Sequence, residues 1–533
     1  MKNHLTTRPG LPAILAATGL TPLLKLSASN ILCRSSHWRV WVAIGLVALA
    51  PSLARPQESA PNIVFILADD LGWSDLGCYG NRYSETPVID HLAADGMRFT
   101  SAYTAPVCTP SRGMILSGQY SARTGVYKTP FMPNDRPWAK IIPPTNWGNH
   151  PVQGTSLGQW LAGMGYATEL IGKADAAPAF LEGMHVVWRD FAPSIGADQA
   201  ERGAQIATIL GADFSARVNR FTRANPGKFV GPVTQEAIRF IAVNKDRPFF
   251  CYVGHYAPHV PLEARDELKR KYEKKWRSFP AAIHPHYAAM CQALDESVGL
   301  ILETLDRLHL SDRTVVMFFS DNGGVKRIFN DGQGAQITDL SPLRGEKGGL
   351  YEGSIRVPLI VRWPGQIKPG SVCDTPVIST DFLPTMAALA GKPLTPNIIT
   401  DGTNLVPLLT GTGPLKRERL FFYFPDYHHD FPAMAVREDR YKLIESAEDG
   451  HLELYDLAAD IGEQHNLAAQ SAAKAADLAQ ALHQWRESLH APLPAPNPHF
   501  DPEKQHLLDP HGETLRKEFF PIPWPPPGEA GTD

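Results

Sequence analysis

The chain has 533 residues, more than one hydrophobic core normally organises, so we expect two domains. Its apolar content of 43% and charged content of 20% are those of a globular protein. A formal net charge of −4 gives no support for nucleic-acid binding, which usually needs a basic face. Any anion-binding site must therefore be a local feature.

The N-terminal region has the pattern of an export signal. Arg34, His37 and Arg39 precede an apolar run at residues 41–54, which is short for a membrane span and ends in a small-x-small cleavage site. A second apolar stretch at residues 11–24 keeps an uncleaved anchor open. We therefore expect residues 1–54 to be a signal peptide or N-terminal anchor. The protein would be exported to the periplasm or outside the cell, without stable membrane insertion unless this segment is retained.

Short apolar runs alternate with stretches of helical periodicity between residues 61 and 410. The runs are rich in Val, Ile and Phe and apolar on both faces, as buried parallel strands are. This alternation predicts an α/β domain at residues 61–410, with helices on both faces of the sheet. The expected strands are residues 63–67, 167–171, 249–253, 314–319 and 358–361, and the clearest helices are residues 235–243 and 286–308.

A different texture follows in the C-terminal part. Short strands separated by turn residues predict a small antiparallel sheet, and an amphipathic helix comes next. We expect a small α+β subdomain at residues 411–495, followed by a Pro-rich tail at residues 496–533. The expected strands are residues 420–424, 433–437, 441–445 and 452–457, and the expected helix is residues 468–489.

The chain has six cysteines, of which Cys33 would leave with the export signal. The remaining five are widely scattered and show neither a disulfide framework nor the CxxC spacing of a metal site. Because an odd number of cysteines cannot all pair, one is left over for chemistry. The count alone does not say which.

Polar side chains follow four of the expected strands. Ligands of open α/β sheets bind beyond the carboxyl ends of the strands, so these residues are candidates for a single site. They would bring acids, an amide, imidazoles and an amine to one edge of the sheet. They are Asp69 and Asp70 after residues 63–67, Lys173 and Asp175 after 167–171, His255 and His259 after 249–253, and Asp321 and Asn322 after 314–319.

Four of these residues, Asp69, Asp70, Asp321 and Asn322, supply only oxygen ligands. Hard cations such as Ca²⁺ or Mg²⁺ take oxygen, whereas zinc prefers nitrogen and sulfur. Three neighbouring carboxylates would repel one another strongly without a cation. Either pair alone fits ordinary turn residues that close a strand. Two such pairs at strand ends of one domain favour a divalent-cation site.

The segment Cys108-Thr109-Pro110-Ser111-Arg112 places a cysteine beside a predicted helix N-terminus. Thr109 is expected to be the N-cap and Pro110 the first helical residue. The helix dipole and the free N–H groups favour negative charge there. A buried structural cysteine ahead of a well-capped helix is the alternative that this local pattern leaves open.

The same segment resembles the C-x-P-x-R motif of the type I sulfatases, a formylglycine-dependent, arylsulfatase-like family within the alkaline phosphatase superfamily. Residues 62–70 are similar to the family's first strand and metal pair, residues 320–324 to its second metal pair, and residues 343–353 to its later lysine-bearing loop. The resemblance runs from about residue 61 to residue 489. It implies an alkaline phosphatase-like α/β fold, with a large mixed, mostly parallel sheet, and makes residues 61–410 the sulfatase catalytic domain. A small C-terminal antiparallel sheet with a packed helix would complete it.

The resemblance also implies a role for each matching residue. In this family a formylglycine-generating enzyme oxidises the cysteine during maturation, and the aldehyde is hydrated to a geminal diol. One hydroxyl attacks sulfur, and loss of a proton from the other expels sulfate, an exit that a plain serine or cysteine lacks. The ligands of the divalent ion, usually calcium, would be Asp69, Asp70, Asp321, Asn322 and the modified Cys108. Arg112 would fix the diol. Lys173, His259 and Lys347 would bind the sulfate and help the leaving group depart.

One position departs from the family. The usual pattern is G-K-x-H, whereas this chain has Gly172-Lys173-Ala174-Asp175. The missing histidine is the family's base for the second hydroxyl. Asp175 could take that role, although it adds negative charge near the sulfate, and His185 is the alternative from elsewhere on the loop. The change could also mark a distinct subgroup or a weakened enzyme.

The leading hypothesis is a sulfuric ester hydrolase that releases inorganic sulfate from a sulfated sugar or polysaccharide. The prediction that the substrate is a sugar rests on the export signal and on analogy with the family. Two alternatives stay open: a phosphoester or phosphonate hydrolase of the same superfamily, and a sulfated-glycan binding protein that has lost turnover through the Asp175 change. Tyr423, Tyr427, His428 and His429 could line an outer subsite or be ordinary loop residues.

Overall fold

A computed structural model of the protein describes residues 60–128, 136–144, 154–187, 198–278, 283–328 and 335–507. The predicted signal peptide or anchor at residues 1–54 lies outside the described residues, as do residues 508–533 of the predicted tail. Within the described part of the chain, no helix is both long and apolar enough to cross a membrane.

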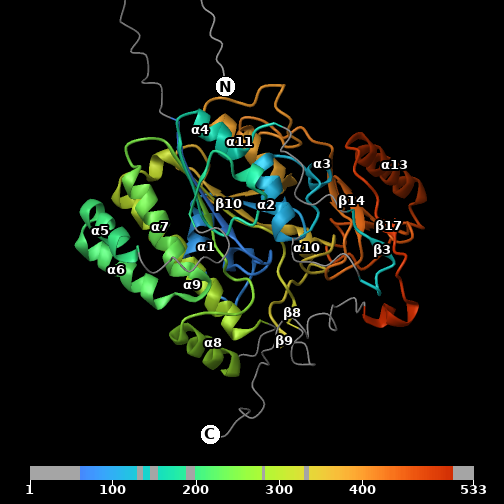
Figure 1. The fold of residues 1–533 in the computed structure, drawn as a ribbon, viewed down its shortest axis with the longest axis horizontal. Helices are drawn as coiled ribbons and strands as arrows, with labels where there is room; N and C mark the ends of the chain where they lie inside the picture. The colour runs from blue at the N-terminus through green and yellow to red at the C-terminus, as the bar shows by residue number, and fades with distance from the viewer. Residues whose placement is uncertain are drawn as a thin grey trace, which may run out of the picture. The chain divides into compact units, whose positions relative to one another are not determined.

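The larger of two main sheets has nine strands and lies between layers of helices (Figure 1). Its strands are β1 (Asn62–Ala68), β2 (Met97–Tyr103), β4 (Ala167–Gly172), β5 (His185–Val187), β6 (Phe249–Gly254), β7 (Thr314–Ser320), β10 (Arg356–Arg362), β11 (Ser371–Cys373) and β12 (Val377–Ile378). They lie in the order β11-β2-β10-β7-β1-β6-β4-β5, with β12 paired to β2. β1 is parallel to both β6 and β7, whereas β10 is antiparallel to both of its neighbours, β7 and β2.

This mixed, mostly parallel sheet confirms the predicted fold class, and all five predicted strands are present. The prediction of a parallel strand at residues 358–361 is wrong in direction, because those residues belong to β10. A local apolar run does not record which strands will pair. β2 was not predicted, because burial alternates over its first residues and its sequence lacks a continuous apolar run.

Helices cover both faces of this sheet (Figure 1). On one face lie α1 (Pro87–Ala94), α7 (Val230–Val243), α8 (Asp266–Ser278) and α9 (Pro285–Arg307), and on the other lie α2 (Cys108–Ser117), α4 (Leu157–Gly163) and α11 (Phe382–Leu389). Ile66 of β1 packs in the first core, and its neighbour Phe65 packs in the second. A strand buried on both faces has the continuous apolar sequence that predicted it. Outside α7, two further helices pack through a small cluster that includes Phe214 and Ile238: α5 (Gln199–Leu210) and α6 (Ala212–Ala224).

A second, antiparallel sheet follows in the C-terminal part. It consists of β13 (Arg419–Phe424), β14 (Ala433–Glu438), β15 (Tyr441–Ser446) and β16 (Leu452–Asp456), and α13 (Ala472–Ser488) packs against it. The predicted small sheet with a packed helix is therefore confirmed. Leu478 of α13 and Val436 of β14 share a core with Tyr103 and Met114 from the β2 and α2 segments, so the small sheet packs on that side of the larger one.

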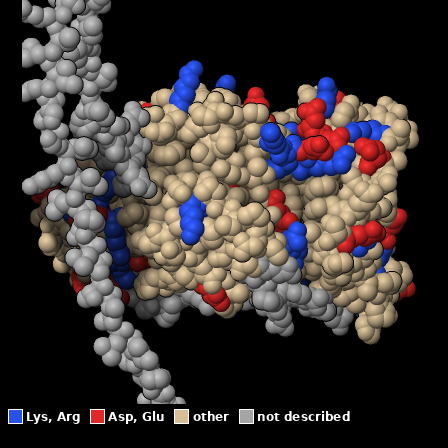
Figure 2. Space-filling model, turned by 90° about the horizontal axis from the view of Figure 1, so that it is seen from above, with Lys and Arg blue, Asp and Glu red and all other residues tan. Residues whose placement is uncertain are grey.

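Short elements complete the described fold: β3 (Ile141–Ile142) paired with β17 (Ala495–Pro496), β8 (Arg327–Ile328) paired with β9 (Ala335–Gln336), and the single-turn helices α3 (Ser121–Thr124), α10 (Glu352–Ile355) and α12 (Val406–Leu409). On the face drawn in Figure 2, basic and acidic side chains are intermingled among uncharged surface. The charged groups of that face therefore produce no large field of a single sign.

Candidate active site

Strand direction brings most of the candidate residues together. β1, β4, β6 and β7 are parallel, so the residues that follow them emerge at one edge of the sheet. β10 runs the other way, so the loop that leads into it, which carries Lys347, lies at the same edge. Backbone hydrogen bonds join these loops, including Asp69 N to Ala257 O (3.1 Å) and Asp321 N to Ala68 O (3.1 Å).

Gly172 allows β4 and β6 to end close together. Its φ is +90°, and a Cβ atom there would lie 2.2 Å from the carbonyl oxygen of Gly254. A side chain would force the two strand ends apart. With glycine present, the N–H of Lys173 donates to Gly254 O at 2.8 Å, which fixes the backbone from which the Lys173 side chain enters the site.

Asp69 and Asp70 are buried carboxylates, each held by a different lysine. Lys173 Nζ donates to Asp69 Oδ2 at 2.6 Å, and Lys347 Nζ donates to Asp70 Oδ1 at 2.6 Å. Asn322 Nδ2 donates to the same Asp70 oxygen at 2.7 Å. Asp70 has φ of 63°, a left-handed conformation that aspartate tolerates better than most residues, and its N–H donates to Asp321 Oδ1 at 3.2 Å.

Three oxygen atoms of this group have no hydrogen-bond donor: Asp69 Oδ1, Asp70 Oδ2 and Asn322 Oδ1. Leaving a buried acceptor unpaired costs about 1–3 kcal/mol, and more for a charged group. Oxygen acceptors of this kind suit a hard cation such as calcium. Ligand atoms of Asp69, Asp70, Cys108 and His259 all lie within 4.8 Å of one another. The residues present therefore fit a divalent cation, and His259, expected only as a catalytic residue, belongs to the same cluster.

Asp321 lies at the edge of this cluster and is held by Arg112. The guanidinium of Arg112 donates twice to Asp321 Oδ2, from Nε at 3.0 Å and from the second terminal nitrogen at 2.7 Å. Its other terminal nitrogen donates to Lys173 O at 2.6 Å. Arg112 is fully buried, so this double hydrogen bond to one carboxylate oxygen is rigid. The other oxygen, Asp321 Oδ1, accepts the Asp70 N–H at 3.2 Å.

The charges of the site shift its pKa values in opposite directions. Burial alone would raise the pKa of Asp69, but Lys173, His259 and Arg112 outweigh burial and hold it well below its usual range. Burial and the charge of Asp69 raise the pKa of Asp321 to about 7, against the opposing effect of Arg112. Two carboxylates so close compete for the same positive charge, and an additional cation would relieve that competition.

Cys108 is buried at the start of α2. The helix begins at Cys108 with Val107 as its N-cap, so the predicted N-cap at Thr109 is wrong. The hydroxyl of Thr109 instead donates to Asp175 Oδ1 at 3.0 Å. Burial raises the pKa of the Cys108 thiol to about 12, although Lys173 and Lys347 oppose that rise. The unmodified thiol is therefore neutral near pH 7 and a weak nucleophile, although Lys347 Nζ lies 3.3 Å from its sulfur.

Asp175 lies beside the cysteine segment. It has φ of 36°, and besides the Thr109 contact its carboxylate lies 3.9 Å from Lys173 Nζ. His185, the alternative base, is not brought to the site: it pairs in register with Glu169, three residues before the end of β4, and its Nδ1 lies 3.2 Å from the Glu169 carboxylate. Three residues along a strand correspond to about 10 Å.

The two histidines after β6 have different surroundings. His259 Nε2 lies 3.5 Å from Asp70 Oδ2, and its Nδ1 contacts the carbonyl oxygen of Val260 at 2.5 Å. A carbonyl only accepts, so Nδ1 carries the proton and Nε2 faces the site. His255 is fully buried, and its Nε2 contacts Ser297 Oγ on α9 at 3.2 Å. His255 is therefore part of the packing between β6 and α9.

The suggested outer subsite divides in the same way. Tyr423 and Tyr427 are buried, and the hydroxyl of Tyr427 donates to Glu448 at 2.6 Å. His428 lies against Gly348, next to Lys347: a Cβ atom on Gly348 would be 2.5 Å from the His428 ring. His429 Nδ1 lies 3.3 Å from Glu346 Oε2 on the same loop. The two histidines thus adjoin the lysine-bearing loop, whereas the tyrosines belong to the core.

The cysteines of the described residues form no disulfide bonds. Among the described residues, Cys78, Cys108, Cys251, Cys291 and Cys373 are all free thiols. Two further residues near the site were not found from the sequence: Thr109, which contacts Asp175, and Lys228, which lies near His259. Pro226-Gly227 marks a turn before Lys228, but no local pattern connects that turn with residues at the strand ends.

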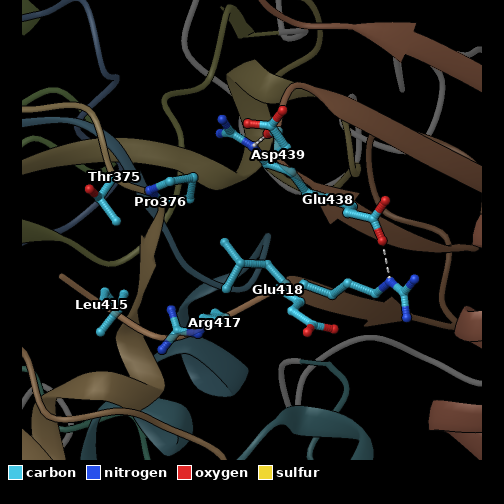
Figure 3. A pocket seen from close by; sticks show the side chains of 10 residues that line it. Thr375, Pro376, Leu415, Arg417, Glu418, Glu438 and Asp439 are labelled. Carbon is cyan, nitrogen blue, oxygen red and sulfur yellow. Dashed lines mark hydrogen bonds and ion pairs between the residues drawn. The ribbon is translucent and has the colours of Figure 1, made fainter.

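A separate cavity of about 410 Å³ lies where β13 and β14 face Thr375 and Pro376 (Figure 3). Among the side chains that line it, Arg419 Nε donates to Glu438 Oε2 at 2.6 Å, and Arg437 Nε donates to the backbone oxygen of Asp439 at 3.0 Å. Arg417 is bonded to the buried Asp381. None of the candidate active-site residues lines this cavity.

The family model Sulfatase matches residues 61–392, and that for the C-terminal part of N-sulphoglucosamine sulphohydrolase matches residues 346–490. The chain belongs to the sulfatase family. This sulfatase is 33% identical to arylsulfatase A of Homo sapiens over 487 residues, 82% of this chain and 89% of that one. It is 31% identical to a sulfatase of Formosa agariphila over 502 residues, 81% and 89% of the two chains. The solved structure of Ps i-CgsB in complex with k-i-k-neocarrahexaose is similar, with a TM-score of 0.61, 27% identity, and 80% and 93% of the two chains covered.

These relationships confirm the predicted family and enzyme class: this sulfatase is a sulfuric ester hydrolase. Sulfatases generally use a formylglycine derived from cysteine together with a divalent metal. The buried group of Asp69, Asp70, Cys108 and His259 is compatible with that chemistry.

Proposed function

We propose that this sulfatase hydrolyses its ester through residue 108, converted from cysteine to formylglycine, beside a bound calcium ion. One observation carries the proposal. Three buried oxygens that lack a hydrogen-bond donor, on Asp69, Asp70 and Asn322, occur in the same site as a buried cysteine at the start of α2. Asp69, Asp70, Asp321, Asn322 and residue 108 would hold the ion. Bound there, it would supply positive charge at the reacting centre.

The neutral thiol of Cys108 supports the need for modification. A buried thiol whose pKa is raised to about 12 is a weak nucleophile near pH 7. Hydrated formylglycine supplies one hydroxyl that attacks sulfur and a second whose deprotonation expels the sulfate. The formylglycine-generating enzyme is therefore the maturation partner that this proposal requires.

The basic side chains would bind the charged substrate. A sulfate monoester repels an anionic nucleophile, and preorganised cations reduce that repulsion in the transition state. Lys173 and Lys347 are placed by Asp69 and Asp70, with the Lys347 amine 3.3 Å from the Cys108 sulfur. Arg112, one helical turn after Cys108, would hold residue 108 in place.

His259 and Asp175 would move protons on opposite sides of the reaction. His259 keeps one proton on Nδ1, bonded to Val260 O, and presents Nε2 to the site. A second proton, taken up on Nε2 to give the imidazolium, is the one that it would donate to the departing alcohol oxygen. Asp175, joined to Thr109 beside residue 108, would accept a proton from residue 108 when sulfate leaves.

A sulfated sugar or polysaccharide is the proposed substrate class, and the proposed location is the periplasm or the cell exterior. The similarity to Ps i-CgsB, solved with a neocarrahexaose, supports a sugar. The N-terminal apolar segment supports export. His428, which adjoins the lysine-bearing loop, is a candidate to contact the sugar.

The test uses protein produced together with the formylglycine-generating enzyme and assayed on 4-nitrophenyl sulfate and on a panel of defined sulfated sugars. Cys108→Ala should reduce turnover by roughly 10⁵-fold or more while preserving the fold, and Cys108→Ser should fail as well, because it lacks a second hydroxyl. The mass of the tryptic peptide that contains residue 108 should be that of the aldehyde or its hydrate.

Cys78→Ala, at another free cysteine outside the site, is the matched control and should remain active. Full sulfatase activity in Cys108→Ser, or an active enzyme whose residue 108 is an unmodified thiol, would contradict the proposal. Faster hydrolysis of 4-nitrophenyl phosphate than of the sulfate would favour the phosphoester alternative.

A further inference from the structure

Lys228 is a buried lysine that the proposed reaction does not use. It lies in η4 (Gly227–Phe229), just before α7, and is only 7% exposed. Burial lowers its pKa, and the charges of Glu263, Asp69 and Asp70 oppose that shift. Lys228 therefore lies within electrostatic reach of the proposed metal pair, although it contacts neither carboxylate.

The side chain of Lys228 meets His259 at a shared acceptor. Lys228 Nζ donates to the carbonyl oxygen of Val260 at 2.9 Å, the oxygen that His259 Nδ1 contacts at 2.5 Å. A carbonyl oxygen has two lone pairs, so it can accept from both. The amine thus fixes the peptide group that sets the orientation and the tautomer of the His259 ring.

The backbone that presents Lys228 to this carbonyl has an unusual conformation. Lys228 and Phe229 both have left-handed conformations, with φ of 47° and 53°, although neither is glycine. Such a conformation is strained for a residue with a side chain and persists only where its surroundings hold it. Here the N–H of Lys228 donates to Glu263 at 3.1 Å, and the Phe229 ring packs edge-on against Tyr256, with centroids 5.5 Å apart. Both contacts join this turn to the loop that carries His259.

The exposed fractions of the two side chains indicate that His259 can contact a substrate and that Lys228 acts from behind it. The His259 side chain is 29% exposed, so a substrate can reach it. Lys228 is nearly enclosed, and its amine is directed to Val260 O.

From these contacts we infer that Lys228 is a positioning residue for His259: it holds the Val260 carbonyl so that Nε2 points at the leaving-group oxygen of the ester. The inference rests on the proposed role of His259 as the acid that protonates the departing alcohol. Its consequence is selective, because a leaving group that is stable as an anion needs no proton, whereas a poor leaving group does.

The experiment compares two esters, 4-nitrophenyl sulfate with a good leaving group and phenyl sulfate with a poor one, in formylglycine-loaded wild type, Lys228→Met, His259→Ala and the double variant. Lys228→Met should lower kcat on phenyl sulfate by about tenfold or more and change kcat on 4-nitrophenyl sulfate by less than about threefold. Because Lys228 acts through His259, the double variant should be no slower than His259→Ala alone.

Lys228→Arg, which keeps a cationic donor, should recover part of the phenyl sulfate activity, and Lys245→Met, at an exposed lysine after α7, should behave as wild type. If Lys228→Met does not fold, Lys228→Gln retains one donor and must show the same selective loss in smaller degree. Equal losses on both esters, or an additive double variant, overturn the inference. The Cys108→Ala assay separately reports whether the proposed function itself holds.

Discussion

Asp175 occupies the position where this chain departs from its family, and its surroundings connect it with residue 108. Its carboxylate accepts a hydrogen bond from Thr109, the residue next to Cys108, and lies 3.9 Å from the Lys173 amine. The same two neighbours would orient either a base or a purely structural carboxylate. Kinetics distinguish these roles, because only a base for sulfate release acts after the first chemical step.

We predict that Asp175→Asn permits the first sulfate transfer and blocks release. An initial burst of about one alcohol per active site should be followed by a steady rate roughly 10²-fold or more below wild type, measured by rapid quench on 4-nitrophenyl sulfate. Asp175→His should retain or raise turnover if the position is equivalent to the family histidine. Normal turnover of Asp175→Asn without a burst would make Asp175 a bystander, and His185 lies too far along the sheet to replace it.

At the scale of elements, a buried cluster of one lysine and two glutamates joins the small sheet to the segment that follows the Lys347 loop. Lys442 of β15 donates to Glu352 of α10 at 3.0 Å and to Glu463 at 2.8 Å, and all three side chains are fully buried. Burial raises the pKa of Glu463 to about 7 even though Lys442 opposes that rise. For Glu352, burial also acts to raise the pKa, but Lys442 and Arg356 outweigh it and lower the value to about 2.

Lys442→Met should therefore destabilise the protein by about 3–5 kcal/mol at neutral pH, because it leaves two buried carboxylates without their shared cation. Both carboxyl groups would then hold their protons more tightly in the folded state than in the unfolded state. The loss should grow with pH from about pH 2, where Glu352 of the wild type ionises, and more steeply above about pH 7, where Glu463 of the wild type loses its proton. Urea unfolding between pH 4 and 8 should therefore show a loss already present at pH 5 that increases toward pH 8.

The exposed ion pair of α13 supplies the control for this prediction. Lys474 contacts Glu438 and is 30% exposed, so Lys474→Met should cost no more than about 1 kcal/mol and show little dependence on pH. A pH-independent loss in Lys442→Met, or losses of equal size in the two variants, would contradict the electrostatic explanation.

At the scale of the whole molecule, the proposed cation joins segments that are distant in sequence. Asp69 and Asp70 follow β1, Cys108 begins α2, and Asp321 and Asn322 follow β7. A cation that binds only the folded state stabilises it by about 2.7 kcal/mol when its concentration is a hundred times its dissociation constant. Binding at this site should therefore stabilise the sheet as a unit.

We predict that exhaustive chelation lowers the melting temperature and stops turnover, and that calcium restores both better than zinc, because the ligands are mainly oxygens. Differential scanning fluorimetry with elemental analysis measures the first effect independently of activity. Asp69→Asn should abolish the calcium-dependent shift in melting temperature, whereas Asp339→Asn, at a partly exposed residue whose carboxylate accepts the Ser341 N–H, should retain it. Unchanged melting and activity in protein shown to be free of metal would refute the site.

The sequence alone determined the type of most elements and which polar residues follow the strands. Strands buried on both faces are continuous apolar runs, so β1, β4, β6 and β7 were predicted within one or two residues, and the residues after them are the ones that meet. The four strands of the small sheet were predicted as closely, because turn residues separate them. Local periodicity and turn chemistry depend on near neighbours, which the sequence displays directly.

Tertiary structure decided the features that depend on distant partners. The direction of β10 follows from pairing with β7 and β2, and β2, with its alternating burial, becomes a strand only through that pairing. Thr109 does not cap α2 because its hydroxyl bonds to Asp175, 66 residues further along the chain. Lys228 reaches the carbonyl beside His259 across 32 residues. Such contacts are set by how the chain folds back on itself, and no local pattern of residues encodes them.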